Sequence, residues 1–108
     1  HRDVENQDID FYSKADLIFL RKIIETTIKN QETIDKNITQ SIKKDWTMDR
    51  IDPTLRAIFR AAAAEFIIQT PPKIVISEFL EIAKSFFPNG KECKLVNGVL
   101  DKLATQIL

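Results

Sequence analysis

Four lysines and two adjacent phenylalanines lie close together near the C-terminal end of the sequence. The lysines are Lys84, Lys91, Lys94 and Lys102, and the aromatic pair is Phe86 and Phe87. Cations hold the backbone of single-stranded RNA, and each base stacked on a flat side chain adds roughly 1–3 kcal/mol. The same residues also fit a helical protein with solvated lysines and one phenylalanine in its core. The residues alone leave both interpretations open.

Enzymatic chemistry has little support in this sequence. The single cysteine, Cys93, has no internal histidine to activate it, because the one histidine is His1. A zinc site would depend almost wholly on carboxylates, which is unusual. Glu78 and Glu81 lie one helical turn apart without a nucleophile or metal ligand beside them. We therefore predict no catalytic residue, metal or cofactor, and interpret the two glutamates as a solvated helix face.

The composition indicates one helical domain spanning residues 1–108. The 16 basic and 16 acidic side chains cancel, so net charge identifies no partner. With only two glycines and four prolines, the chain has few means of forming hairpin turns. Its apolar runs are too short to cross a membrane, and the lone cysteine is typical of a reducing compartment. We expect an all-α, cytoplasmic protein.

Helical spacing in the first half predicts one long helix, or two in tandem, over residues 14–42. Ser13 is the expected cap, and residues 1–12 are expected to form a loosely ordered lead-in. Isoleucines recur every four residues from Ile34 to Ile42, and a loop is expected at residues 45–51. Trp46 and Ile51 are interpreted as core residues at the end of the bundle, since a tryptophan is more often core than a stacking platform.

A second helix is predicted to begin at Asp52-Pro53, where a capping carboxylate precedes a proline suited to the first turn. Its buried face is expected to comprise Leu55, Ile58, Phe59, Ala62, Ala63, Phe66 and Ile67. Arg56, Arg60 and Glu65 are expected off that face, and Pro71-Pro72 is expected to end the helix.

Two more helices are predicted, one over residues 74–86 and one that follows the break at Pro88-Asn89-Gly90 and runs to the chain end. Asn97-Gly98 would ordinarily favour a hairpin turn, but the surrounding apolar residues follow helical spacing. Glycine inside a helix costs roughly 1 kcal/mol relative to alanine. We therefore expect Gly98 to lie against a neighbouring helix, such as the alanine-rich face of residues 57–64.

Three segments occur in a recognisable order: WTMDRIDPTLRAIFRAAAAE at residues 46–65, PKIVISEFLEIAK at 72–84 and LVNGVLDK at 95–102. Together they resemble the NusB family of bacterial transcription antitermination factors over about residues 14–105. The resemblance implies a NusB-like helical bundle that is not an enzyme. It also implies binding to boxA RNA with the ribosomal protein NusE, within an RNA polymerase antitermination complex active during ribosomal RNA transcription.

The resemblance also assigns candidate site residues. Those expected to bind RNA are Lys84, Phe86, Phe87, Lys91, Lys94, Leu95 and Asn97, with Leu95 where the family commonly has phenylalanine. Arg60 and Glu65 match positions that contact NusE in relatives, and an exposed ion pair is the alternative. The family's N-terminal arginine-rich helices are expected to be absent from this chain. Alternative functions are a homodimeric interaction domain and an RNA-binding domain related to that of ribosomal RNA cytosine methyltransferases.

Overall fold

The chain folds into helices, as the composition predicts. The structure is a computed structural model that describes residues 2–43 and 46–108, with side chains described from Lys14 onward. Within those ranges there are five helices and no strand: α1 (Arg2–Lys29), α2 (Gln31–Ser41), α3 (Pro53–Ile67), α4 (Pro72–Phe86) and α5 (Lys91–Ile107). The all-α prediction is confirmed. None of the described helices is long and apolar enough to span a membrane.

The first half of the chain contains two helices in tandem, separated at Asn30. The Asn30 side chain donates a hydrogen bond to the carbonyl of Thr26 at 2.8 Å, and its own carbonyl accepts from the amide of Ile34 at 2.8 Å. A short polar side chain that bonds to the backbone in this way favours a helix boundary. The predicted start at Ser13 is wrong, because α1 begins at Arg2 and includes the expected lead-in. No glycine or proline precedes Pro53 to interrupt it.

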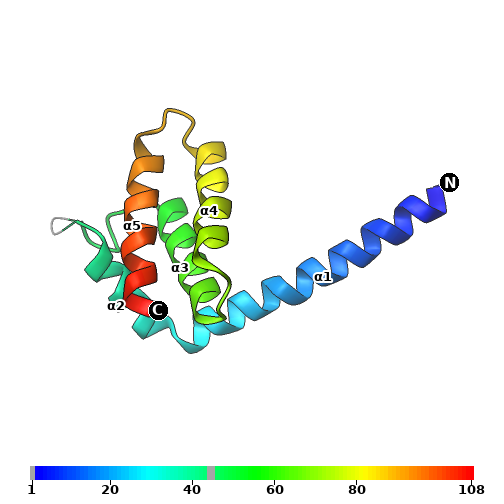
Figure 1. The fold of residues 1–108 in the computed structure, drawn as a ribbon, viewed down its shortest axis with the longest axis horizontal. Coiled ribbons are helices and arrows are strands. Elements are labelled where there is room, and N and C mark those ends of the chain that lie inside the picture. The colour runs from blue at the N-terminus through cyan, green and yellow to red at the C-terminus, as the bar shows by residue number, and fades with distance from the viewer. Residues whose placement is uncertain (1, 44–45) are drawn as a thin grey trace.

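Helix α3 occupies the centre of the bundle and contacts each of the other four helices. Its Phe59 and Phe66 are fully buried, and Ala62–Ala64 present a thin, fully buried surface that allows close packing. Burying a large apolar side chain stabilises a fold by roughly 1.5–3 kcal/mol. Figure 1 shows α4 and α5 running beside α3, while α1 extends away from the bundle. The core therefore consists of residues from α2 to α5, together with Ile42 and Ile51 from the segment between α2 and α3.

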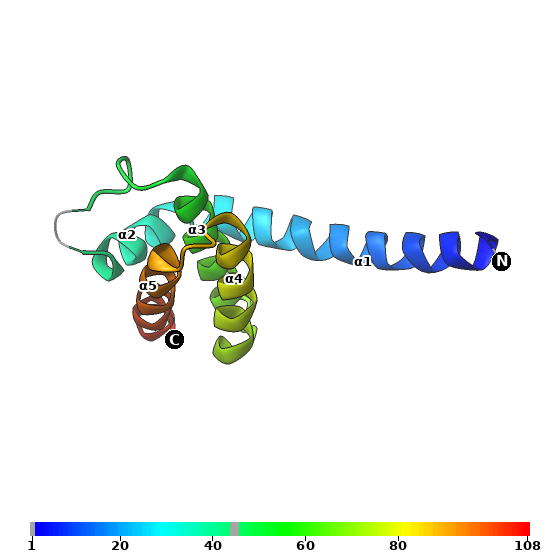
Figure 2. The same cartoon turned by 90° about the horizontal axis from the view of Figure 1, so that it is seen from above.

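The projecting part of α1 carries exposed apolar side chains. Leu17, Ile18, Leu20, Ile24 and Ile28 are between 48% and 72% exposed. Figure 2 shows the N-terminal part of α1 standing clear of the other helices. The apolar residues at helical spacing do form a helix, but most of these side chains, which we call the apolar stripe of α1, are not covered by other described residues.

The predicted start of α3 is confirmed, whereas the predicted role of Pro71 and Pro72 is wrong. Asp52 caps α3, with its side chain accepting from the amide of Thr54 at 2.7 Å. Helix α3 ends at Ile67, and the chain turns through Gln69 at a positive φ of 67°. Pro71 and Pro72 instead begin α4, which corrects the prediction that they end α3. A proline in a first turn sacrifices no helical hydrogen bond.

The helical reading of Asn97-Gly98 is confirmed, because both residues lie inside α5. The predicted reason for Gly98 is wrong. Gly98 is exposed, and a Cβ atom added to it would meet nothing within 4 Å. Close packing against another described helix therefore does not account for a glycine at this position.

Candidate nucleic-acid interface

A groove of about 740 Å³ opens between the segment before α3 and the N-terminal half of α5. We call it the α5 groove. Ile51 and Leu55, both buried in the core, also line it. Its remaining lining residues are mostly aromatic or charged: Lys43, Trp46, Arg50, Asp52, Phe87, Lys91, Glu92, Lys94 and Leu95. Segments far apart in the sequence thus form one concave surface.

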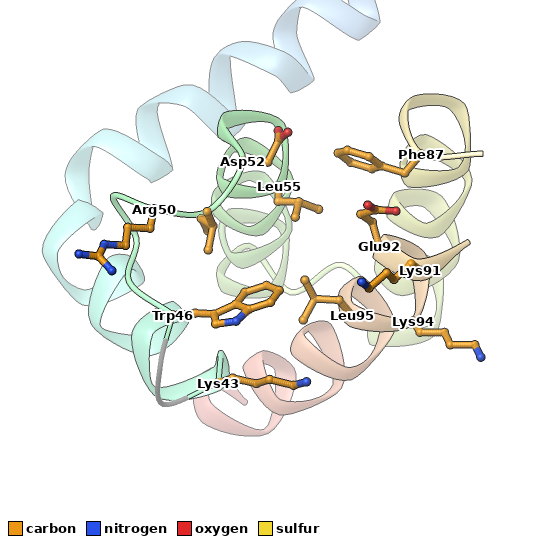
Figure 3. A pocket seen from close by; sticks show the side chains of 11 residues that line it. Lys43, Trp46, Arg50, Asp52, Leu55, Phe87, Lys91, Glu92, Lys94 and Leu95 are labelled. Atoms are coloured by element: carbon orange, nitrogen blue, oxygen red, sulfur yellow. The ribbon is translucent and has the colours of Figure 1, made fainter. Parts of the chain in front are cut away.

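Trp46 forms one side of the groove. Figure 3 shows Trp46 and Leu95 pointing toward one another from the loop and from α5. Trp46 is 37% exposed, so the prediction that it belongs to the core is wrong. The regular helical spacing ends with α2 at Ser41, and after the loop Ile51 takes the core position instead. Asp45, where the loop was expected to begin, lies outside the described residues.

The segment that carries Trp46 is tied to the bundle by hydrogen bonds. The amide of Trp46 donates to the carbonyl of Lys43 at 2.9 Å, and the amide of Arg50 donates to the carbonyl of Thr47 at 3.0 Å. Arg56 on α3 donates through Nη1 to the carbonyl of Met48 at 2.8 Å. These bonds hold the exposed indole near its observed position relative to α3.

Phe87 is fixed by the turn between α4 and α5. Its carbonyl accepts from the amide of Gly90 at 3.3 Å and from the thiol of Cys93 at 3.8 Å. Gly90 begins α5 with a φ of 83°, a left-handed conformation that glycine adopts readily. Phe87 is half-buried and lines the groove, so it offers an aromatic surface from the side of α4.

The charged residues of the groove favour an anion. Lys43, Arg50, Lys91 and Lys94 are basic, whereas Asp52 and Glu92 are acidic, which leaves an excess of two positive charges (4 − 2). The Asp52 carboxylate already accepts the capping hydrogen bond from Thr54. Lysine and arginine side chains around aromatic surfaces form the combination that binds single-stranded nucleic acid.

The structure brings four of the seven predicted RNA-binding residues together: Phe87, Lys91, Lys94 and Leu95 line the α5 groove. Lys84 instead pairs with Glu81 at 3.3 Å on the exposed side of α4. Phe86 is 61% exposed and lines a separate apolar groove between α3 and α4. Asn97 is exposed on α5 and does not line the α5 groove.

Among the lining residues that sequence reasoning missed, three are basic or aromatic: Lys43, Trp46 and Arg50. They belong to a segment without helical periodicity, so no pattern placed them opposite α5. The available signal was composition, since a tryptophan between basic residues in a loop is itself typical of a nucleic-acid surface.

Arg60 and Glu65, the predicted NusE contacts, occupy different environments. Arg60 forms two hydrogen bonds with Asp35 of α2, at 2.9 and 3.0 Å, and both side chains remain about 30% exposed. Glu65 is only 2% exposed, so the prediction that it lies off the buried face is wrong. Its Oε2 has no hydrogen-bond partner within the described part of the chain. Burial, and secondarily the charge of Glu78, raises the pKa of Glu65.

A metal site is not formed by the side chains that the structure describes, since no three histidine, cysteine or acidic residues come together there. The fold and groove thus define an all-α protein with a basic, aromatic-lined groove suited to a single-stranded nucleic acid. The NusB family matches residues 2–105. The chain belongs to the NusB family.

Several relatives are transcription antitermination proteins NusB. The one from Sinorhizobium fredii is 38% identical over 99% of this chain and 68% of its own length, and that from Agrobacterium fabrum is 38% identical over 99% and 66%. The one from Gluconobacter oxydans is 40% identical over 83% of this chain and 56% of its own length. This chain therefore corresponds to about two thirds of the first two relatives. No solved structure matches the chain significantly.

Proposed function

We propose that this chain acts in transcription antitermination by holding a boxA-type single-stranded RNA in the α5 groove. Membership of the NusB family supports the role in antitermination, because the relatives carry that name. The observation that carries the proposal is the placement of Trp46 opposite Leu95, between basic residues from two segments. One base would stack on the exposed indole while the lysines contact phosphates.

NusE is the proposed protein partner, within an RNA polymerase complex that promotes ribosomal RNA transcription. Its proposed site is the side of α3 that carries Arg60, whose side chain is partly exposed and held in place by Asp35. An oriented guanidinium is a suitable interface anchor. Glu65 is reached only after the side chains around it move, because it is 2% exposed.

Binding of fluorescently labelled boxA RNA, measured by anisotropy with and without NusE, tests the proposal. We expect tighter binding with NusE, and roughly tenfold weaker binding after Trp46→Ala, since one lost stack is worth about 1–3 kcal/mol. Trp46→Phe should retain most of the affinity. Trp46 is the chain's single tryptophan, so RNA titrated into the chain alone should also quench its fluorescence.

The matched charge comparison is Lys43→Ala against Lys73→Ala. Lys43 lines the groove, whereas Lys73 is exposed at the far end of α4. Each phosphate contact on a single strand contributes about 0.7 to the slope of log affinity against log salt. Lys43→Ala should reduce that slope and Lys73→Ala should not. The proposal fails if NusE brings no gain in affinity, or if Trp46→Ala binds as tightly as the parent chain.

A further inference from the structure

Helix α5 has an unexplained glycine next to the groove. Gly98 lies in the middle of the helix, where glycine weakens the structure relative to alanine. Its φ is not in the left-handed region, and a Cβ atom there would meet nothing within 4 Å. Neither backbone conformation nor packing within the described chain therefore requires a glycine.

Gly98 continues the line of residues that lines the α5 groove. Lys91, Lys94, Leu95, Gly98 and Lys102 are spaced at i, i+3, i+4, i+7 and i+11, which places them along one side of a helix. The first three line the groove. From Lys91 to Lys102 this line covers about 16 Å at 1.5 Å per residue.

The charge along this line is basic on both sides of the glycine. Lys94 and Lys102 are both exposed, and neither forms an ion pair with a residue whose side chain is described. Asp101 lies three residues after Gly98 and seven after Lys94, so its carboxylate is beside this line and offsets part of the positive charge. Because Gly98 has no side chain and lies between two cations, a sugar-phosphate backbone could approach the helix closely at this position.

We propose that the RNA leaves the α5 groove along α5 and crosses Gly98, where its backbone lies directly against the helix, to reach Lys102. This inference rests on the proposed RNA-binding function and extends the site by about two helical turns. A side chain at position 98 would separate the RNA from α5, which accounts for a glycine there.

The test uses this chain with NusE and two labelled RNAs: a short boxA oligonucleotide and the same sequence extended by several nucleotides on each side. We expect Gly98→Leu to weaken binding of the extended RNA at least fivefold and to leave the short RNA nearly unaffected. Lys102→Ala should also weaken the extended RNA and flatten its salt dependence. Ser77→Leu places the same side chain at an exposed position of α4 and should change neither affinity.

Gly98→Ala separates a binding effect from misfolding. It should raise the melting temperature by a few degrees, because alanine favours a helix and has free space here, while it still weakens the extended RNA. Circular dichroism first establishes that Gly98→Leu is folded. The inference is overturned if the parent chain binds both RNAs and this variant binds each of them as tightly as the parent chain does. If the parent chain binds neither RNA, the proposed function itself fails.

Discussion

Glu65 is the least favourably placed polar side chain among the residues described. It is buried on α3, its Oε2 lacks a hydrogen-bond partner there, and burial raises its pKa. A raised pKa means that the unfolded chain releases this proton at a lower pH than the folded chain does. Ionisation of this carboxyl group therefore costs no stability in acid, and it costs an increasing amount as pH rises from about 4 toward the raised pKa.

Glu65→Gln should remove this cost while keeping the side chain's size. We expect the free energy of unfolding at pH 7 to increase, because glutamine stays neutral and avoids the cost of ionising a buried carboxyl group. The increase should shrink as pH falls toward 4. Urea denaturation at several pH values measures it, with Glu81→Gln on the exposed side of α4 as the control. An increase that does not depend on pH would contradict the assignment.

The sequence did not predict the burial of single residues that depart from the periodic pattern. Periodicity identifies which side of a helix is apolar. It does not predict the burial of Glu65, because that burial depends on how the neighbouring helices pack against α3. Trp46 was expected in the core on the usual preference of its residue type. Its loop lies across the surface because Ile51 and Leu55 fill the core there.

At the scale of elements, the start of α3 is the best-defined boundary in the chain. Asp52→Ala removes the carboxylate that accepts from the amide of Thr54 at 2.7 Å. We expect a loss of about 1 kcal/mol in the free energy of unfolding, typical of a lost N-cap. Asp49→Ala, three residues earlier and exposed, removes the same charge without a cap and should have little effect. Equal losses in the two variants would show that charge, rather than capping, is responsible.

The helices themselves followed from local signals, whereas the groove did not. Spacing of apolar residues and the Asp52-Pro53 cap predicted α3, α4 and α5 within a few residues. The groove requires the segment at Trp46 to face Leu95, about fifty residues later, and no local signal specifies that contact. The resemblance assigned RNA contacts only to the half of the groove formed by α4 and α5, although one of its matching segments, residues 46–65, contains Trp46 and Arg50.

At the scale of the whole molecule, the bundle has a buried core, whereas the projecting part of α1 has exposed apolar side chains. The core is formed by apolar residues of α2 to α5, whereas the apolar side chains along α1 remain exposed, at 63% for Leu17 and 67% for Ile28. A contiguous apolar surface of this kind usually marks an interaction site. In an antiparallel pair of α1 helices centred between Phe19 and Leu20, Lys14 of one copy would lie opposite Glu25 of the other.

We therefore predict that this chain self-associates through α1 when it is alone in solution. Leu20→Lys combined with Ile24→Lys should reduce the mass measured by light scattering from that of a dimer to that of a monomer, because charges would have to be buried in the interface. Ile74→Lys is the control, since Ile74 is similarly exposed, at 49%, but lies on α4. A parent chain that stays monomeric at every concentration, or a dimer unaffected by the double substitution, would refute the prediction.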